Sequence, residues 1–118
     1  MSYDIDLNCP VTGKVIEFDS PHDIKGGTYR IGGTLCAELN ITYNYSTIFY
    51  KLFPEKGIRI LYGMTGADSI SLLTEAISKL SDDISEDYWK CTEGNVKKVL
   101  YQLVSFAKLR PDGVWNGD

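Results

Sequence analysis

Few residues in this chain have side chains suited to catalysis. The single histidine, His22, lies in the segment Ser20-Pro21-His22-Asp23. A histidine beside a carboxylate can act as a general base, because it titrates near neutral pH. Ser20 is too close along the chain to be placed as the nucleophile for such a base. We therefore favour a turn residue whose ring caps nearby backbone groups, and keep His22 as a rim residue of a candidate binding site.

The cysteines do not form a recognisable ligand or disulfide pattern. Cys9, Cys36 and Cys91 are odd in number and lie far apart along the chain. Structural zinc sites usually pair ligands two to four residues apart, and neither these cysteines nor His22 are spaced in that way. The two Gly-Gly pairs within 26–33 also lack the spacing of phosphate-binding loops. The sequence predicts reduced thiols, no metal site and no cofactor.

Aromatic residues are concentrated in the middle of the chain, where residues 43–62 hold six of the twelve tyrosines and phenylalanines. Tyrosine brings contact area and a polar hydroxyl, which suits binding surfaces. A polar and aromatic strand end over 40–46 can bind carbohydrate, nucleobase or peptide; alternatively, its tyrosines seal the rim of the core. We assign no catalytic residues. The candidate binding residues are Tyr29, Arg30, Tyr43, Tyr45, Tyr50, Tyr62 and His22.

Two of these tyrosines carry a specific expectation about burial. Tyr43 and Tyr45 are two residues apart, so a continuing strand places them on the same side as Ile41. Because Ile41 is expected in the core, Tyr43 is predicted to turn inward. Tyr45, at the strand end, is predicted to keep its hydroxyl in water and to serve binding.

Length and charge limit the class of protein. The chain has 118 residues and a formal net charge of −4, which fits one domain over 1–118. A net negative surface repels phosphate, so nucleic acid and anionic membranes are not expected as partners, whereas a basic protein would suit it. No window holds the ~18 apolar residues that span a bilayer. The first residues lack the features of a signal peptide, and we expect a cytoplasmic location.

The first half of the chain has the patterns of strands. Polar and apolar residues alternate over 3–7, and a turn leads to a second short strand over 15–18. A break is predicted at 20–23, followed by a strand over 28–31. The strongest alternation covers 35–43 and predicts the longest strand. The residues of that strand expected to face the core are Leu35, Ala37, Leu39 and Ile41.

The second half changes to helical spacing. Ser46 is a candidate cap for a short helix over 47–53, while residues 57–63 fit a helical turn or a strand equally well. Asp68 or Thr65 caps a clear helix with an apolar stripe. Thr92 opens the last helix, which should end before the proline at position 111.

This order of elements predicts an α+β fold. An antiparallel β-meander in the N-terminal half, with strands about 3–45, is packed on one face by two or three C-terminal helices over about 46–110. A short tail, 111–118, follows. Its Trp115 either packs against the body or projects as an interface anchor, and packing is expected because exposure forfeits about 1.5–3 kcal/mol.

Several short segments resemble a family of small bacterial proteins to which no activity is attached. The resemblance therefore implies no catalytic role. In size and acidity the chain is also similar to immunity proteins that neutralise toxins, without a shared motif. The segments that carry the family resemblance are Pro10-Val11-Thr12-Gly13, Asn40-Ile41-Thr42-Tyr43-Asn44-Tyr45, Tyr62-Gly63-Met64-Thr65-Gly66-Ala67-Asp68-Ser69-Ile70 and Arg110-Pro111-Asp112-Gly113-Val114-Trp115.

Two functional hypotheses follow. The first is a small non-enzymatic binding or interaction protein, with an immunity-type inhibitor of a basic protein partner as one form. The second is a protein or enzyme that binds a small molecule, sugar-like or nucleotide-like, in a pocket between sheet and helices. Tyrosines and Arg30 would line that pocket.

The scattered thiols and the missing ligand pairs make a prediction about stability. The protein should unfold as one cooperative unit whose melting temperature is unchanged by dithiothreitol or EDTA. Differential scanning calorimetry with and without each reagent measures this. A large fall in melting temperature in either reagent would show that a disulfide or a metal supports the fold.

Overall fold

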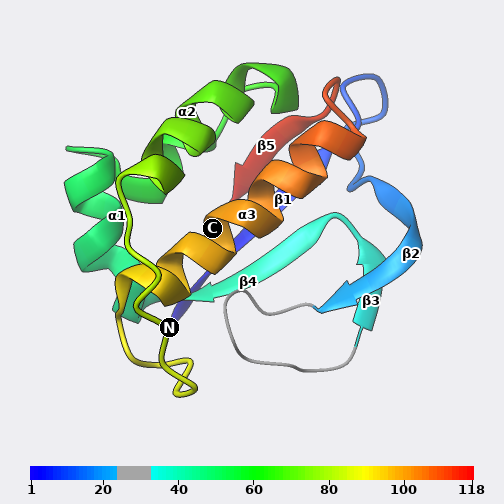
Figure 1. The fold of residues 1–118 in the computed structure, drawn as a ribbon. Coiled ribbons are helices and arrows are strands. Elements are labelled where there is room, and N and C mark those ends of the chain that lie inside the picture. The colour runs from blue at the N-terminus through cyan, green and yellow to red at the C-terminus, as the bar shows by residue number, and fades with distance from the viewer. Residues whose placement is uncertain (24–32) are drawn as a thin grey trace.

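An antiparallel sheet with the first strand at its centre organises the computed structural model, which describes residues 1–23 and 33–118 (Figure 1). Strand β1 (Ser2–Asn8) lies between β4 (Glu38–Thr42) and β5 (Val114–Gly117). The predicted alternation in β1 is confirmed, since its residues Tyr3, Ile5 and Leu7 are buried. One face of this sheet therefore contributes the floor of the core.

The predicted long strand over 35–43 is divided into two. Strand β3 (Gly33–Cys36) pairs with β2 (Glu17–Asp23), while β4 pairs with β1. At Ala37, between them, the backbone N–H donates to the Ile16 carbonyl at 2.7 Å and the carbonyl accepts from Leu7 N–H at 2.9 Å. This exchange of partners turns Leu35 outward, 43% exposed, so its prediction as a core residue is wrong. Ala37, Leu39 and Ile41 are buried as predicted.

Three short helical segments follow β4. They are η1 (Tyr43–Tyr45), α1 (Ser46–Leu52) and η2 (Gly57–Leu61). The ambiguous segment after Pro54 is thus a 3₁₀ helix. The prediction of Ser46 as a helix cap is wrong, because Ser46 is the first residue of α1 and bonds to the Tyr3 hydroxyl at 2.7 Å instead.

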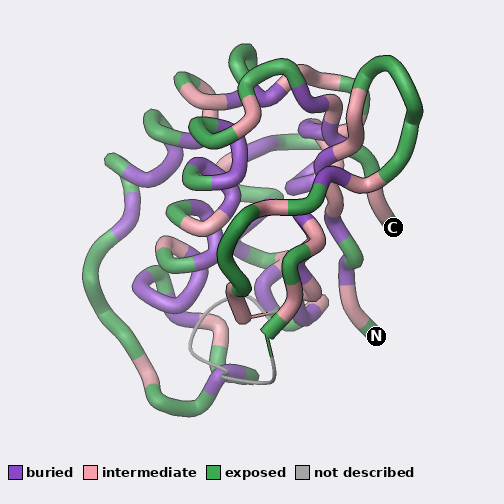
Figure 2. Tube along the Cα trace, turned by 90° about the vertical axis from the view of Figure 1, so that its right-hand side faces the viewer, coloured by how far each residue is buried: buried purple, intermediate pink, exposed green. Residues whose placement is uncertain are grey.

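Two longer helices cover one face of the sheet. Helix α2 (Gly66–Ser78) packs on α3 (Glu93–Leu109), which crosses the front of the sheet in Figure 1. The hydroxyls of Thr65 and Thr92 cap these helices: each accepts from the main-chain N–H of the third helical residue, Asp68 in α2 and Asn95 in α3. Figure 2 shows buried positions recurring along the inward sides of these helices. Thr65, rather than Asp68, is therefore the cap of α2.

The acidic connector between α2 and α3 is held by a buried amide. Asn95 accepts from the backbone N–H of Ser85 and donates to the carbonyl oxygens of Asp87 and Lys90, all at 3.1 Å. Gly94 is needed where this connector crosses the helix, because an added Cβ would lie 2.6 Å from the Asp83 carbonyl group. Main-chain contact, rather than helix propensity, explains this glycine.

The predicted tail is the third strand of the sheet. Leu7 of β1 pairs with Trp115 of β5, whose side chain is only 1% exposed. The Trp115 indole N–H donates to Ser69 Oγ at 2.8 Å, and Ser69 in turn donates to the Gly66 carbonyl. Trp115 thus packs against the body, as expected. The chain has an α+β fold with antiparallel strands in its N-terminal half and helices packed against them, and that prediction is confirmed.

Removing the Ser69 hydroxyl tests how much its hydrogen bond with the Trp115 indole contributes to stability. Ser69→Ala leaves the Trp115 N–H buried without an acceptor, which should lower the free energy of unfolding by about 1–3 kcal/mol. Urea denaturation measures the loss. Ser71→Ala, at an exposed position of the same helix, is the matched control and should have little effect. Equal stability of the two variants would show that the hydrogen bond from Trp115 to Ser69 does not stabilise the fold.

Candidate functional site

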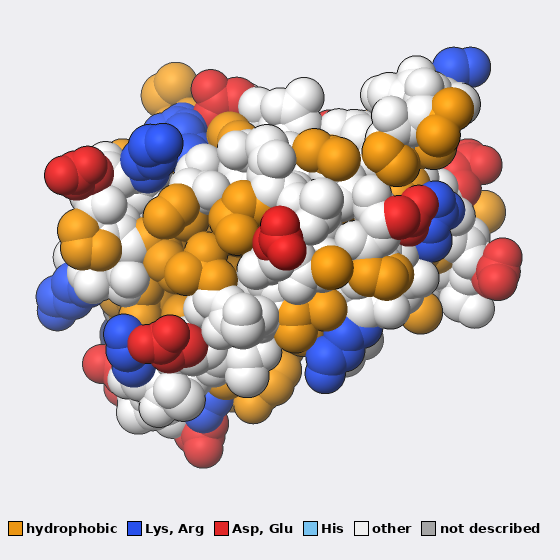
Figure 3. All heavy atoms as spheres, turned by 90° about the horizontal axis from the view of Figure 1, so that it is seen from above, with side chains coloured by type: hydrophobic (Ala, Val, Ile, Leu, Met, Phe, Trp, Pro, Cys, Tyr) orange, Lys and Arg blue, Asp and Glu red, His pale blue; other side chains and the backbone are white. Residues whose placement is uncertain are grey.

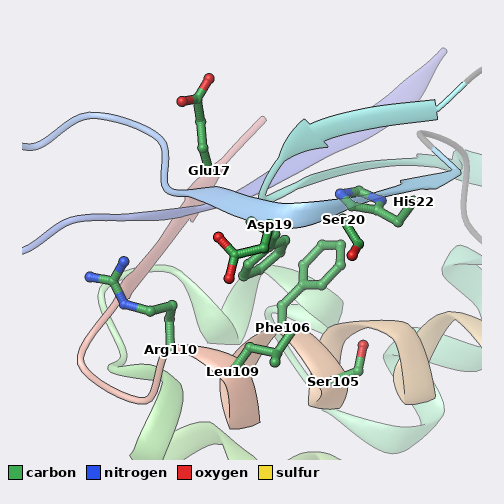
Figure 4. A pocket seen from close by; sticks show the side chains of 9 residues that line it. Glu17, Asp19, Ser20, His22, Ser105, Phe106, Leu109 and Arg110 are labelled. Carbon is green, nitrogen blue, oxygen red and sulfur yellow. The ribbon is translucent and has the colours of Figure 1, made fainter.

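A groove of about 610 Å³ lies between β2 and the C-terminal half of α3 (Figure 4). We call it the β2–α3 groove. Its volume falls within the usual range for small-ligand sites, about 300–1,000 Å³. Aromatic and aliphatic side chains form its floor, and charged and hydroxyl groups stand around them in Figure 4. The lining residues are Glu17, Phe18, Asp19, Ser20, His22, Ser105, Phe106, Leu109 and Arg110.

The wall formed by β2 is irregular. Glu17 pairs with Cys36 and His22 with Thr34, so four residues of β2 lie opposite Leu35 alone. Such a bulge bends a strand and redirects its side chains. The predicted break at 20–23 is wrong, because these residues belong to β2. Pro21 is tolerated there because a bulge interrupts the regular ladder of hydrogen bonds.

The floor of the groove is an aromatic cluster. The Phe18 and Phe106 rings lie 5.2 Å apart between centroids, and the His22 ring lies 4.7 Å from Phe106. Phe106 is buried, whereas Leu109, one turn further along α3, is 64% exposed at the groove. Sequence reasoning missed both residues because they lie beside the main apolar stripe of α3. Their spacing of three residues was the signal that could have placed them together on one face of the helix.

The His22 ring is held by main-chain groups. Its Nε2 lies 2.6 Å from the Cys36 carbonyl oxygen and its Nδ1 lies 2.9 Å from the Asp23 carbonyl oxygen. A general base needs a ring nitrogen directed at the proton that it removes. Here both nitrogens face carbonyl oxygens, and the Ser105 hydroxyl donates to the Gln102 carbonyl. The geometry suits a ring that fixes β2 against β3 and α3.

The rim of the groove is acidic. Glu17 and Asp19 both come from β2; in Figure 4 the Asp19 carboxylate lies on the side of β2 that faces α3, whereas the Glu17 carboxylate points away from α3. The one cation among the lining residues, Arg110, donates to Asp112 through Nε and a terminal nitrogen, both at 2.9 Å. This pairing lowers the pKa of Asp112 and raises that of Arg110. With Arg110 paired to Asp112, Glu17 and Asp19 leave a net negative charge on the described residues that line the groove.

One of the predicted tyrosines, Tyr43, belongs to a second cluster, with Tyr3 and Arg59. Tyr43 lies edge-on to Tyr3, with ring centroids 4.6 Å apart, and its hydroxyl accepts from Arg59 at 3.2 Å. Arg59 stacks on the Tyr3 ring at 4.9 Å and pairs with Asp118 at 2.7 Å. Among the described residues, Arg59 makes an Arg–Tyr combination of the kind that was expected around Arg30, and Arg30 itself lies outside the described residues.

Tyr62 lies beside this second cluster, and burial, together with the nearby Asp118 charge, raises the pKa of its phenol to about 12. Its hydroxyl is buried and makes no hydrogen bond within the described residues. None of these tyrosines lines the β2–α3 groove.

The burial predicted for Tyr43 and Tyr45 is reversed. Tyr45 is fully buried and its hydroxyl donates to the Tyr88 carbonyl, while Tyr43 is half-buried. The strand ends at Thr42, and the chain enters a 3₁₀ turn in which the two-residue period no longer holds. Tyr50 is 44% exposed, on α1. Tyr29 and Arg30 lie outside the described residues.

An apolar surface elsewhere is a weaker candidate. Figure 3 shows hydrophobic side chains gathered on the face seen from above, over α1 and α2. The hollow there, lined by Leu52, Phe53 and Leu72 among others, measures only about 80 Å³. It is far below the size of usual ligand sites. The β2–α3 groove is therefore the preferred site.

Over residues 1–23 and 33–118, no three His, Cys, Asp or Glu side chains are grouped so as to hold a metal ion. The three cysteines are free thiols. Within the same ranges, no helix has the length and apolar character needed to cross a bilayer. No protein-family model, curated protein or solved structure matches the chain.

The Cys9 thiol lies in the turn that follows β1, close to the groove residue Arg110. The main-chain N–H of Thr12, the Thr12 hydroxyl and the main-chain N–H of Val11 stabilise its thiolate and lower its pKa, with a smaller effect of Arg110. Burial has the opposite effect on Cys91 and raises the pKa of that thiol. The two cysteines should therefore differ in reactivity, since the thiolate is the nucleophile.

Alkylation with iodoacetamide tests this difference. Cys9 should react several-fold faster than Cys91 at pH 8. As the pH is lowered, the alkylation rate of Cys9 should fall later than that of Cys91, because the lowered pKa of Cys9 keeps its thiolate populated at lower pH. Peptide mass spectrometry follows both sites. Thr12→Val removes the hydroxyl without burying Cys9, so it should shift the pH profile of Cys9 upward. An unchanged profile in Thr12→Val would refute the electrostatic cause.

Proposed function

We propose that this chain is a non-enzymatic binding protein that takes an extended segment of a basic partner protein into the β2–α3 groove. The observation that carries the proposal is an aromatic floor bordered by carboxylates that form no ion pair with any described residue. Phe18 and Phe106 offer apolar contact, while Glu17 and Asp19 offer charge. A segment that alternates apolar and basic side chains would satisfy both.

The shape of β2 supports an extended occupant. Between Glu17 and His22 the ladder with β3 is interrupted, so this stretch is less fully engaged by its own sheet than a regular strand is. Strand edges of this kind accept peptides through main-chain hydrogen bonds, and pockets for alternate side chains give specificity. The exposed side chain of Leu109 adds an apolar contact on the opposite wall.

The contacts of His22 favour binding over catalysis. Both ring nitrogens are engaged with carbonyl oxygens of the protein, which leaves the ring to hold the groove in shape. An inhibitor of the immunity type, acting on a basic toxin, would use this chemistry, since acidic surfaces speed the association of oppositely charged proteins.

One observation favours a second candidate, a small-molecule binding protein. The groove has the volume of a small-ligand site, and His22 lies at its rim. A sugar-like or nucleotide-like ring would stack on Phe18 and bond to Ser20 or Ser105. The net negative rim makes an anionic nucleotide the less suitable of the two.

A pair of labelled peptides tests the first proposal. Fluorescence anisotropy should show saturable binding of a seven-residue Lys-Leu alternating peptide and none of its Glu-Leu counterpart. Reversing the rim charge with Glu17→Lys and Asp19→Lys should weaken binding at least tenfold, equivalent to about 1.4 kcal/mol. Leu109→Ser should weaken binding because it removes the apolar contact without changing the charge of the groove.

The control for overall charge is a variant with the same two-charge reversal elsewhere. Asp83→Lys with Glu86→Lys changes exposed residues of the connector, and should reduce binding less than twofold. If this control weakens binding as much as the rim variant, the peptide senses only net charge and the groove is not its site. Preference for the Glu-Leu peptide would also overturn the proposal.

A further inference from the structure

A second cavity, of about 670 Å³, lies at the opposite end of α3 from the β2–α3 groove. We call it the lysine cavity. It is bounded by α1, by the end of α2 and by the chain that enters α3. With 17 residues, α3 is about 25 Å long, so the two cavities are separate sites. The lining residues are Thr47, Ile48, Lys51, Leu52, Lys79, Leu80, Asp83, Lys90, Cys91, Thr92 and Glu93.

Three lysines are among the residues that line this cavity. Lys51 comes from α1, Lys79 from the end of α2 and Lys90 from the connector. Asp83 and Glu93 also line the cavity, so the lining residues have a formal charge of +1 if the loose pair of Lys79 with Glu75, which lies outside the lining, is not counted. The chain as a whole carries −4. A positively charged cavity in a negatively charged protein attracts anionic ligands.

The positive groups are available to a ligand. Lys79 makes only a loose pair with Glu75, at 3.7 Å on the exposed face of α2. Lys51 and Lys90 form no ion pair with any residue of the described ranges. One of the two opposing carboxylates, that of Glu93, already accepts from the backbone N–H of Ser81 at 2.8 Å.

The floor of the cavity is apolar. Ile48 and Leu80 are buried and Leu52 is half-buried. Burial raises the pKa of the neighbouring Cys91 thiol, which is consistent with poor access of water to this floor. A ligand that suits both features has a charged end and an apolar end.

The N-terminus of α3 does not supply the charge. The Gly94 N–H donates to the Asp83 carbonyl at 2.9 Å, and the Asn95 N–H donates to Thr92 Oγ1 at 3.1 Å. These donors of the first turn are used within the protein. Recognition of an anion at this cavity therefore falls to the lysine side chains.

We propose that the lysine cavity binds a small organic anion. Its carboxylate or phosphate lies between the Lys51 and Lys90 ammonium groups, and its short apolar part rests on Ile48, Leu52 and Leu80. This site is independent of the partner-binding groove and would add a ligand-binding function to the protein.

Three matched six-carbon probes test the proposal on the full chain. Hexanoate and hexyl phosphate carry the two candidate head groups, and hexanol has the same apolar part without charge. In ¹H–¹⁵N spectra, at least one anion should shift the amides of Ile48, Leu80 and Cys91 saturably below about 10 mM. Hexanol should not. The anion that binds more tightly identifies the preferred head group.

Variants separate the cavity from general electrostatics. Lys51→Gln with Lys90→Gln should weaken anion binding at least tenfold. Lys56→Gln with Lys98→Gln removes two exposed lysines that do not line the cavity, and should change affinity less than twofold. Equal losses in the two pairs, equal binding of hexanol, or no saturable shift with either anion would overturn the proposal. Peptide binding at the β2–α3 groove should be the same in both pairs, so failure of one site is distinguishable from failure of the other.

Discussion

The pairing of the last strand with the first is the constraint on which the rest of the structure depends. Trp115 is fixed on three sides: its strand pairs with β1, its backbone N–H donates to the Met64 carbonyl and its carbonyl accepts from Gly63 N–H. The indole N–H bonds to Ser69 beneath α2. The sheet, the turn between η2 and α2, and helix α2 are therefore joined through one buried residue. The backbone at Gly66 also lies close to the backbone of Arg110 and Pro111, which completes this junction.

This junction determines where α3 lies, and α3 in turn provides both cavities. Its C-terminal half faces the bulge of β2, and its N-terminal cap faces α1 and the end of α2. The charges are divided between these ends. Among the described residues, carboxylates without an ion pair border the groove at one end, and lysines line the cavity at the other. A protein with a net charge of −4 thus offers surfaces of both signs, which separates the kinds of ligand each end can attract.

The polar groups near the groove are used mainly for structure. His22 holds β2 to β3 through carbonyl oxygens, and Arg110 holds the turn before β5 through Asp112. Such groups are positioned firmly but have little freedom to move protons. The recognition that we propose for this groove needs a preorganised surface, and these contacts with main-chain and neighbouring groups support that proposal.

The sequence by itself determined the elements whose side-chain period is regular: β1, α2 and α3, the cap at Thr92 and hence the α+β class. Each is set by local spacing and main-chain hydrogen bonding. Tertiary structure alone decided where the period is interrupted. At Ala37 the backbone changes partners, and at Thr42 its N–H is taken by the Tyr88 hydroxyl at 2.7 Å. Leu35 therefore turns outward, Tyr45 inward, and Arg59 meets Tyr43, because contacts with distant residues outweigh the local pattern.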